Sequence, residues 1–367
     1  MLRELRISGF RGFREFAMMG LGRVNLLVGT NNCGKTSVLE AIHMLSTPGS
    51  ALPLWLAQRL RGEYIEAASE VRIDIASVIH GYELAKDRQF EIVGHGTSGR
   101  EELKASLVRA DLDRRDVDDD DGGDVGTLEP GVLRRLLLHL RWADNEPTME
   151  LRLPLTRGRL RDRAYRPHVV SAGAIEAPQR ATVSFITAEG LPRERVIAMF
   201  ERIVLTPEEA FVTGALRTIE PAIERIASIA TYQNQSSREG RGGLAVMIAG
   251  QRVSIGSMGD GIWRLLGIAL ALANARGSVL LVDEIDTGLH YSVLVDMWRL
   301  VLETARTLDV QVFATTHSRD CYEALAAVAE PGRNEISLQR IERGKVEAVA
   351  FSELEIRQAA ERGLEVR

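Results

Sequence analysis

Polar and apolar positions follow two different periods along this chain, and the periods predict different elements. Charged and apolar residues alternate over residues 2–16, which is typical of strands with one exposed face. Short, mainly apolar runs at 24–28, 278–282 and 310–315 predict buried strands. Further strands, at 71–79 and 90–93, are expected in a peripheral sheet. Helical spacing at 36–45 and 291–308, and an apolar run at 262–275, predict helices.

A capping box predicts one more helix. Thr206 precedes Pro207, which suits the first helical position, and Glu209 stands three residues after Thr206. We expect a helix from there to about residue 229, followed by a polar, glycine-rich loop at 233–243.

The first motif that carries chemistry follows the apolar run at 24–28. Residues 29–36 read Gly-Thr-Asn-Asn-Cys-Gly-Lys-Thr, a full match to the phosphate-loop pattern. Gly29 and Gly34 permit a tight loop whose N–H groups point at phosphates on a helix N-terminus. Lys35 supplies a compact cation for the β- and γ-phosphates, and Thr36 offers a hydroxyl to Mg²⁺. The alternative is a glycine turn with a solvated lysine.

The second motif is an apolar strand that ends in two acids, Asp283 and Glu284. In this position Asp283 can hold the shell of Mg²⁺, and Glu284 can polarise the attacking water. A strand that ends in two acids is common, so the interpretation depends on the phosphate loop.

Two weaker candidates complete the set. The segment from Ser257 to Gly261, with Gly259 and Asp260 inside it, precedes an apolar helix and suits a γ-phosphate. It would serve equally well as a helix cap, with Ser257 or Asp260 at the N-cap. His317 lies two residues after the run at 310–315 and is either a structural histidine or a catalytic one. Its position, one helix and one strand after Glu284, favours catalysis.

Composition limits the class of protein. The chain has 367 residues, 45% of them hydrophobic and 26% charged, which is ordinary for a globular protein. A net charge of -5 gives no overall attraction to nucleic acid or anionic membranes. Cys33 and Cys321 are too few for a disulfide framework, so we expect reduced thiols. No signal peptide and no apolar stretch long enough to span a bilayer is present, so we expect a cytoplasmic protein without membrane contact.

Two segments between the motifs are strongly charged. Residues 110–127 are rich in aspartate and glycine, which predicts a solvated loop. Residues 157–166 (Arg157 to Arg166) hold five arginines, which could bind a nucleic-acid backbone or line a solvated strand face.

Together the four motifs resemble the Walker A, signature, Walker B and switch-histidine elements of ABC ATPases. Residues 257–261, 283–292 and 314–318 more closely resemble the ATPase part of OLD-family proteins. The opening Ile-Ser-Gly-Phe-Arg-Gly-Phe at 7–13 is similar to that family's first strand and to RecF and SMC heads. The resemblance is dense over 1–45 and 250–322 and thin between.

The resemblance implies an α/β ABC-type P-loop head with a mixed central sheet, a peripheral antiparallel sheet and a helical lobe. ATP and Mg²⁺ are the implied cofactors, and the catalytic residues are Glu284 and His317. The residues implied to bind nucleotide are Gly29, Asn31, Asn32, Gly34, Lys35, Thr36, Ser37, Ser257, Gly259, Asp260 and Gly261, with Thr36 and Asp283 as metal ligands. The signature of one protomer would face the γ-phosphate held by another, so a homodimer or higher homo-oligomer is implied.

Three features of the sequence depart from the family pattern. His290 stands where ABC proteins carry the aspartate of the D-loop. No glutamine can be assigned to the Q-loop, and Gln58 is left out. Only fifty residues follow His317, too few for the metal-binding Toprim nuclease domain of OLD-family nucleases, so we expect no nuclease activity in this chain.

The expected organisation has four parts. Residues 1–192 form an ATPase lobe with Walker A and the peripheral sheet, 193–249 a helical insert and loop, 250–332 a second lobe with the signature, Walker B and His317, and 333–367 a C-terminal segment. The favoured function is an ATPase that senses or scaffolds in an anti-phage system with a separate nuclease or other effector. The alternatives are a RecF-like repair ATPase that clamps duplex DNA as a dimer, and an ATP-binding module that barely turns over.

Overall fold

The computed structural model describes residues 1–67, 70–85, 88–111, 134–144, 149–156, 159–161, 183–229 and 243–366. The chain divides into two compact units. Unit 1 comprises residues 1–4, 18–39 and 177–367, and unit 2 comprises residues 5–17 and 40–176. The acidic segment from residue 112 onward and most of the arginine run at 157–166 lie outside the described residues.

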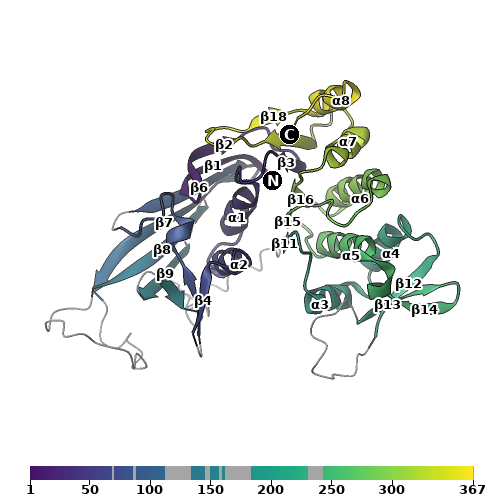
Figure 1. Ribbon diagram of the computed structural model, residues 1–367, viewed down its shortest axis with the longest axis horizontal. Coiled ribbons are helices and arrows are strands. Elements are labelled where there is room, and N and C mark those ends of the chain that lie inside the picture. The colour runs from purple at the N-terminus through teal and green to yellow at the C-terminus, as the bar shows by residue number, and fades with distance from the viewer. Residues whose placement is uncertain are drawn as a thin grey trace. The chain divides into compact units, whose positions relative to one another are not determined.

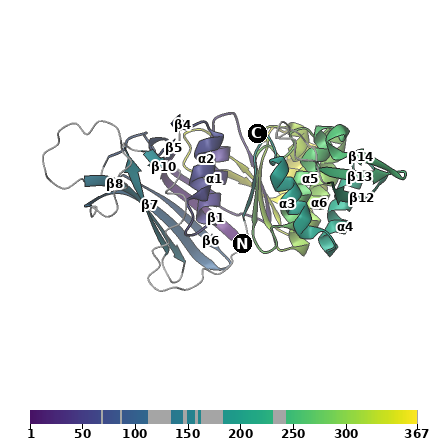
Figure 2. The ribbon, with the colours of Figure 1, turned by 90° about the horizontal axis from the view of Figure 1, so that it is seen from below.

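Most of unit 2 is a nine-stranded sheet with the strand order β2-β1-β6-β7-β8-β9-β10-β5-β4. The pairings from β6 through β10 to β5 and β4 are antiparallel. Figures 1 and 2 both show the long strands β7 and β8 side by side. The strands of this sheet are β1 (Leu2–Phe10), β2 (Phe13–Met18), β4 (Tyr64–Ala67), β5 (Glu70–Asp74), β6 (Gln89–Gly96), β7 (Gly99–Asp111), β8 (Arg134–Asp144), β9 (Met149–Thr156) and β10 (Arg159–Arg161).

Unit 1 is built on a six-stranded sheet with the order β11-β15-β16-β3-β17-β18. The first five strands are parallel, and only β18 runs antiparallel to its neighbour. Burial of β3 and β16 at every position explains their mostly apolar sequence, and their polar residues Asn25, Gln311 and Thr315 are buried too. The strands are β3 (Val24–Val28), β11 (Ser184–Ile186), β15 (Val279–Val282), β16 (Gln311–Thr315), β17 (Ile336–Arg340) and β18 (Val349–Phe351).

Helices and a small three-stranded sheet complete the two units. In unit 1, α5 contacts α3, α4 and α6, and Figure 1 shows it between α4 and α6. The small sheet has the order β12-β13-β14, with bounds β12 (Ile223–Ser228), β13 (Leu244–Ile248) and β14 (Gln251–Ser254). The helices are α1 (Lys35–Leu45), α2 (Leu52–Leu60), α3 (Arg193–Ile203), α4 (Pro207–Arg217), α5 (Asp260–Ala273), α6 (Leu294–Thr307), α7 (Arg319–Val328) and α8 (Glu353–Glu361), with 3-10 turns η1 (Ala76–Val78), η4 (Ile255–Met258) and η5 (Tyr291–Val293).

The predicted fold class is confirmed: an α/β protein with a mixed central sheet, an antiparallel second sheet and a group of helices beside a small sheet. The strands predicted at 24–28, 278–282 and 310–315 all lie in the central sheet, as β3, β15 and β16. Helix α5 is buried from Ile262 to Ala273, which accounts for a sequence that is apolar there except at Arg264.

The helix predicted from Pro207 to about residue 229 is wrong in its second half. Helix α4 ends at Arg217, and residues 223–228 form β12. Pro221 accounts for the break, because it has no N–H to donate and biases the residue before it away from helical geometry. The capping box also fails to form: the Thr206 hydroxyl donates to Ile203 O, and Glu209 accepts from Leu205 N.

Two other boundaries differ from the prediction. The strand expected at 71–79 ends at Asp74, because the Asp74 side chain accepts a hydrogen bond from Ala76 N and starts a turn that continues into η1. The helix expected from 291 begins with the 3-10 turn η5 and is α-helical only from Leu294.

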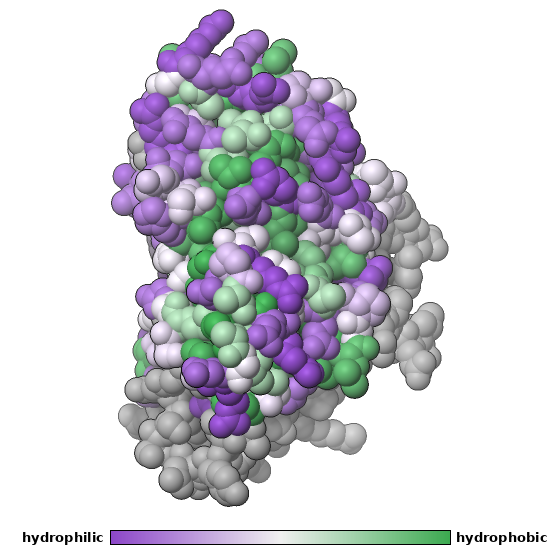
Figure 3. Space-filling model, turned by 90° about the vertical axis from the view of Figure 1, so that its right-hand side faces the viewer, coloured by the Kyte–Doolittle hydropathy of each residue, from purple (hydrophilic) through white to green (hydrophobic). Residues whose placement is uncertain are grey.

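Polar and apolar side chains are mixed on the face drawn in Figure 3, where apolar areas are broken up by hydrophilic residues. Among the described residues of unit 1, Leu205 and Val346 are the most exposed large apolar side chains, at 91% and 66%. No helix within the described ranges is both long enough and apolar enough to cross a membrane.

Candidate active site

Four neighbouring strands of unit 1 end at the same edge of the central sheet. Because β11, β15, β16 and β3 are parallel, the residues that follow them meet at their carboxyl ends. The phosphate loop follows β3, Asp283 follows β15, and Thr316 and His317 follow β16. Ligands of open α/β sheets bind at this edge, so the sheet brings three of the four sequence motifs together.

The phosphate loop connects β3 to α1 and depends on backbone conformations that favour glycine. Gly29 has φ 144°, Gly34 has φ 107° and Asn32 has φ 59°. A Cβ at Gly29 would lie 2.3 Å from the carbonyl oxygen of Ile341, the residue that follows β17, so the main chain there excludes any side chain. Asn31 and Asn32 are exposed at the tip of this loop. The loop therefore presents main chain to whatever lies over it.

Lys35 is the first residue of α1, and its ammonium group turns back into the loop. Its Nζ donates to Gly29 O at 2.8 Å and to Thr30 O at 2.9 Å. The residue is only 6% exposed, and burial lowers the pKa of Lys35 below its usual range while Cys33, Asp283 and Glu284 act in the opposite direction. Ser37 is buried in the first turn of the same helix.

A chain of hydrogen bonds joins the phosphate loop to the end of β15. Thr36 Oγ1 donates to Asp283 Oδ2 at 2.9 Å, and Thr315 Oγ1 donates to Asp283 Oδ1 at 2.6 Å. Both oxygens of the Asp283 carboxylate are therefore held by hydroxyl groups from two other elements. A hydroxyl beside a carboxylate is a set of oxygen donors that fits Mg²⁺, which keeps several waters and takes the rest of its ligands from phosphates.

Glu284 adopts an unusual backbone conformation directly after Asp283. Its φ is 48°, in the left-handed region that residues other than glycine seldom adopt. Its N–H donates to Thr315 Oγ1 at 2.8 Å, and its carboxylate accepts from Thr287 Oγ1 at 3.2 Å. Strained backbone that is held by several neighbours is typical of functional sites.

His317 lies next to the lysine of the phosphate loop. Its Nδ1 is 3.5 Å from Lys35 Nζ. Burial lowers the pKa of His317, the Lys35 cation lowers it further, and the carboxylates of Glu284 and Asp283 act in the opposite direction. A neutral imidazole is favoured, which can accept from the lysine through one ring nitrogen and donate through the other.

The predicted signature residues lie at the start of α5. Gly259, with φ 90°, is the N-cap of this helix, so neither Ser257 nor Asp260 fills that position as the helix-cap alternative required. Ser257 is exposed in η4, and its hydroxyl donates to Ser254 O at 2.7 Å. A Cβ at Gly261 would lie 3.1 Å from the carbonyl oxygen of Gly288, so glycine permits close contact with the loop after Glu284.

Sequence reasoning missed two residues that hold this site. The Thr315 hydroxyl donates to the Asp283 carboxylate and accepts from the Glu284 N–H. The sequence signal for this residue was its place beside Thr316 and His317 at the end of a strand. Arg264 is the one charged residue of the apolar run at 262–275, and it donates to the main-chain carbonyls of Asp283 and Glu284. A single charge inside an otherwise buried helix was the available signal.

Two positions that the family pattern left open have structural partners. The His290 ring bonds Ser292 within η5 and lies 4.3 Å, between ring centroids, from the ring of Tyr291. Gln58, in unit 2, is fully buried and bonds Arg11 and Ser77. This network explains Gln58 without a role at the nucleotide.

The chain matches one protein-family model over most of its length. The model described as "AAA domain, putative AbiEii toxin, Type IV TA system" matches residues 24–320, which contain all four motifs. Among curated proteins, an ATP/GTP phosphatase of Helicobacter pylori is 21% identical over 358 residues, covering 89% of this chain and 88% of that protein. RecF of Clostridioides difficile is 44% identical over 45 residues, 12% of each chain.

Solved structures with a similar chain trace include SMC heads. The SMC head domain from Thermotoga maritima has a TM-score of 0.44 and 14% identity, covering 96% of this chain and 98% of that chain. An Smc head bound to a ScpA domain derived from Pyrococcus furiosus has a TM-score of 0.47 and 13% identity, covering 98% of both chains.

Proposed function

Since the chain belongs to the family described as "AAA domain, putative AbiEii toxin, Type IV TA system", we propose that it binds ATP with Mg²⁺ at residues 29–36 and hydrolyses it. The hydrogen bond from Thr36 to Asp283 carries this proposal, because it joins the phosphate loop and the acidic strand end into one set of ligands. The name of the Helicobacter pylori relative, an ATP/GTP phosphatase, supports a test of both nucleotides.

Each residue has a role that follows from its contacts. Lys35 exchanges its bonds to the carbonyls of Gly29 and Thr30 for phosphate oxygens, and this exchange is favourable because its buried charge gains anionic partners. Thr36 and Asp283 would hold Mg²⁺, whose charge would neutralise that of the phosphates. Glu284 accepts a proton from the attacking water, and His317, held neutral beside Lys35, donates a hydrogen bond to phosphate.

The signature residues act on a second copy of the chain in this proposal. Ser257, Gly259, Asp260 and Gly261 form the exposed or half-buried start of α5, where main-chain N–H groups and the helix dipole favour an anion. A symmetric homodimer would place this turn against the γ-phosphate held by the partner, giving two equivalent sites.

Beyond ATP hydrolysis, we propose that the protein acts together with a separate effector protein. The family description names a toxin of a toxin–antitoxin system, which supports a function in a system of more than one component. We favour an anti-phage ATPase that acts with a nuclease or other effector in trans. Copurification of the protein encoded by the neighbouring gene tests this part directly, and a stable ATP-dependent complex with it is the expected result.

RecF-like DNA binding is the second candidate, and the short match to RecF favours it. A clamp on duplex DNA requires ATP-dependent binding that weakens steeply with salt, because bound lysines and arginines release counterions from the phosphate backbone. A titration of duplex DNA at several salt concentrations, with and without ATP, separates this candidate from the first.

Phosphate release from ATP and GTP tests the central activity. Wild-type protein should release phosphate in the presence of Mg²⁺, and phosphate release should stop when the metal is chelated. Lys345→Ala, which changes an exposed lysine in a turn, should behave as wild type and serves as the matched control for Lys35→Ala. If wild-type protein binds nucleotide and releases no phosphate, the proposed hydrolysis is wrong and the chain is an ATP-binding module.

A further inference from the structure

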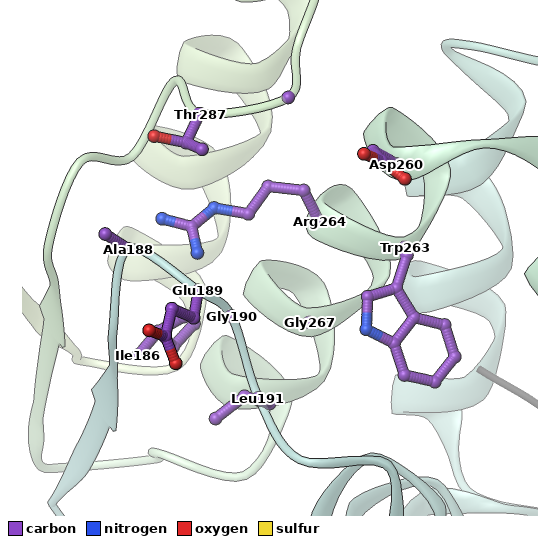
Figure 4. Close-up of a pocket in the computed structure, with 11 residues that line it drawn as sticks. Ile186, Ala188, Glu189, Gly190, Leu191, Asp260, Trp263, Arg264, Gly267 and Thr287 are labelled. Carbon is purple, nitrogen blue, oxygen red and sulfur yellow. The ribbon is translucent and has the colours of Figure 1, made fainter. Parts of the chain in front are cut away.

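One buried arginine in α5 bonds three main-chain carbonyl groups at the carboxyl edge of the central sheet. Arg264 Nη1 donates to Thr187 O, and Nη2 donates to Asp283 O and Glu284 O, all at 2.7 Å. The residue is 6% exposed. In Figure 4 its side chain reaches from α5 toward the segment of Ala188 and Glu189, whereas Trp263 points away from it.

Arg264 bonds one main-chain polar group of Glu284, and Thr315 bonds the other. The Glu284 N–H donates to Thr315 Oγ1, and the Glu284 carbonyl accepts from Arg264, so both main-chain polar groups of a residue with φ 48° are fixed. A left-handed glutamate is costly and persists only where its surroundings determine it. Fixing the main chain at both groups also fixes the direction of the Cα–Cβ bond, from which the Glu284 side chain extends.

Arg264 also lies one helical turn from the start of α5. Asp260 is the first residue of this helix, and Arg264 follows it by four positions, so the two lie on the same side one turn apart. Both line a cavity of about 80 Å³ together with Glu189, Thr287 and Gly288. The arginine Nε has no hydrogen-bond partner among the described residues, so the three carbonyl groups are the hydrogen-bond acceptors of this buried cation, and the charges of Asp283, Glu284 and Asp286 also favour it.

We propose that Arg264 is a positioning residue that sets the catalytic geometry of Glu284 and ties it to the helix that begins at the signature turn. The role rests on the proposed ATP hydrolysis. It needs a forked, planar cation, because one guanidinium reaches three carbonyls from two loops, whereas a lysine ammonium is a point charge that cannot span them in the same way.

The first test separates binding from turnover in Arg264→Lys and Arg264→Ala. We expect kcat for ATP to fall on the order of 10²-fold in both, with KM within about threefold of wild type, because a misplaced carboxylate slows chemistry and leaves the phosphate loop intact. Arg276→Ala is the matched control: this arginine lies just beyond α5 and makes an exposed ion pair with Glu208. Its kcat should match wild type.

Rescue by a small cation sharpens the test. Guanidinium chloride at concentrations below denaturation should restore part of the kcat of Arg264→Ala, since it can occupy the space of the missing group, and should leave Glu284→Gln inactive. If Arg264→Ala does not fold, Arg264→Lys alone decides. A kcat of Arg264→Lys within about threefold of wild type overturns the proposal.

Hydrogen exchange gives a readout that does not depend on turnover. The amides of Glu284 and Ile285 bond Thr315, and they should exchange faster in both Arg264 variants than in wild type and Arg276→Ala. If wild-type protein does not hydrolyse ATP, the proposed function fails, and this exchange rate decides the inference separately. Unchanged exchange at both amides contradicts the positioning role.

Discussion

Thr36 Oγ1, in the first turn of α1, donates a 2.9 Å hydrogen bond to Oδ2 of Asp283, 247 positions later in the chain. The parallel pairing of β15, β16 and β3 makes this contact possible, because it sets the carboxyl ends of these strands side by side. The other Asp283 oxygen accepts from Thr315, so the carboxylate is oriented before any ligand binds. Such preorganisation is what a site for Mg²⁺ and ATP needs.

Lys35→Ala should lose ATP binding while the protein stays folded. The ammonium group makes charge-assisted hydrogen bonds worth roughly 1.5–3 kcal/mol each, so two such bonds to phosphate correspond to a loss of on the order of 100-fold or more in affinity. Titration with a fluorescent ATP analogue measures this, with Lys345→Ala as the control. Unchanged affinity would show that residues 29–36 do not bind the nucleotide.

Glu284→Gln should bind ATP as tightly as wild type and hydrolyse it more slowly by on the order of 10²- to 10⁴-fold, because an amide cannot accept the proton of the attacking water. The ATP-bound dimer should accumulate in this variant, and light scattering after gel filtration measures it. Glu303→Gln, an exposed position on α6, is the control. Turnover at the wild-type rate would remove Glu284 from the catalytic role.

Thr315→Val should lower the stability of the protein by removing the hydroxyl that bonds Asp283 and Glu284. Valine matches threonine in shape but neither donates to Asp283 nor accepts from the Glu284 N–H, and Thr315 is fully buried. We expect unfolding to become easier by about 1–3 kcal/mol, the usual cost of a buried polar group without a partner. Thr315→Ser keeps the hydroxyl and should retain most of the stability and activity in chemical denaturation and phosphate-release assays.

Protonation of His317 should set the acid limb of the pH profile of kcat/KM. Burial and the Lys35 cation lower the pKa of this histidine below its usual value of 6.5, so the ring stays neutral as the pH falls through 6.5. Between the lowered pKa and 6.5 the unfolded chain binds more protons than the folded one, so stability rises with pH across this window and is lost as the pH falls through it. The acid limb of kcat/KM that His317→Ala removes should therefore have its midpoint below 6.5. A midpoint above that value would contradict the neutral imidazole.

The sequence predicted the elements of the site better than their connections. The phosphate loop, Asp283 and Glu284 could be proposed from the sequence because their pattern is local: a glycine loop between strand and helix, and acids at the end of an apolar strand. Arg264 and Thr315 could not be assigned a role, since each acts through hydrogen bonds to residues far away in the sequence. Such contacts depend on strand order, which periodicity does not give.

Local signals also failed where tertiary structure decided the outcome. The pattern after Pro207 favoured a long helix, yet Ile223 and Ile226 are buried in a strand that pairs with β13. Gly259, and neither Ser257 nor Asp260, is the N-cap of α5. In the first case burial against β13 overrode the local helical pattern. In the second, three exposed residues could each cap the helix, and the positive φ of 90° at Gly259 suits glycine.

Complementation between two inactive variants tests the composite site most directly. Lys35→Ala removes the phosphate-loop cation, and Ser257→Arg blocks the signature turn, so each should be inactive alone. A mixed dimer pairs an intact Lys35 of one protomer with an intact Ser257 of the other at one of its two sites. Partial recovery of phosphate release on mixing is the predicted result. No recovery, with subunit exchange demonstrated by differently tagged protomers, would contradict a site shared between two copies of the chain.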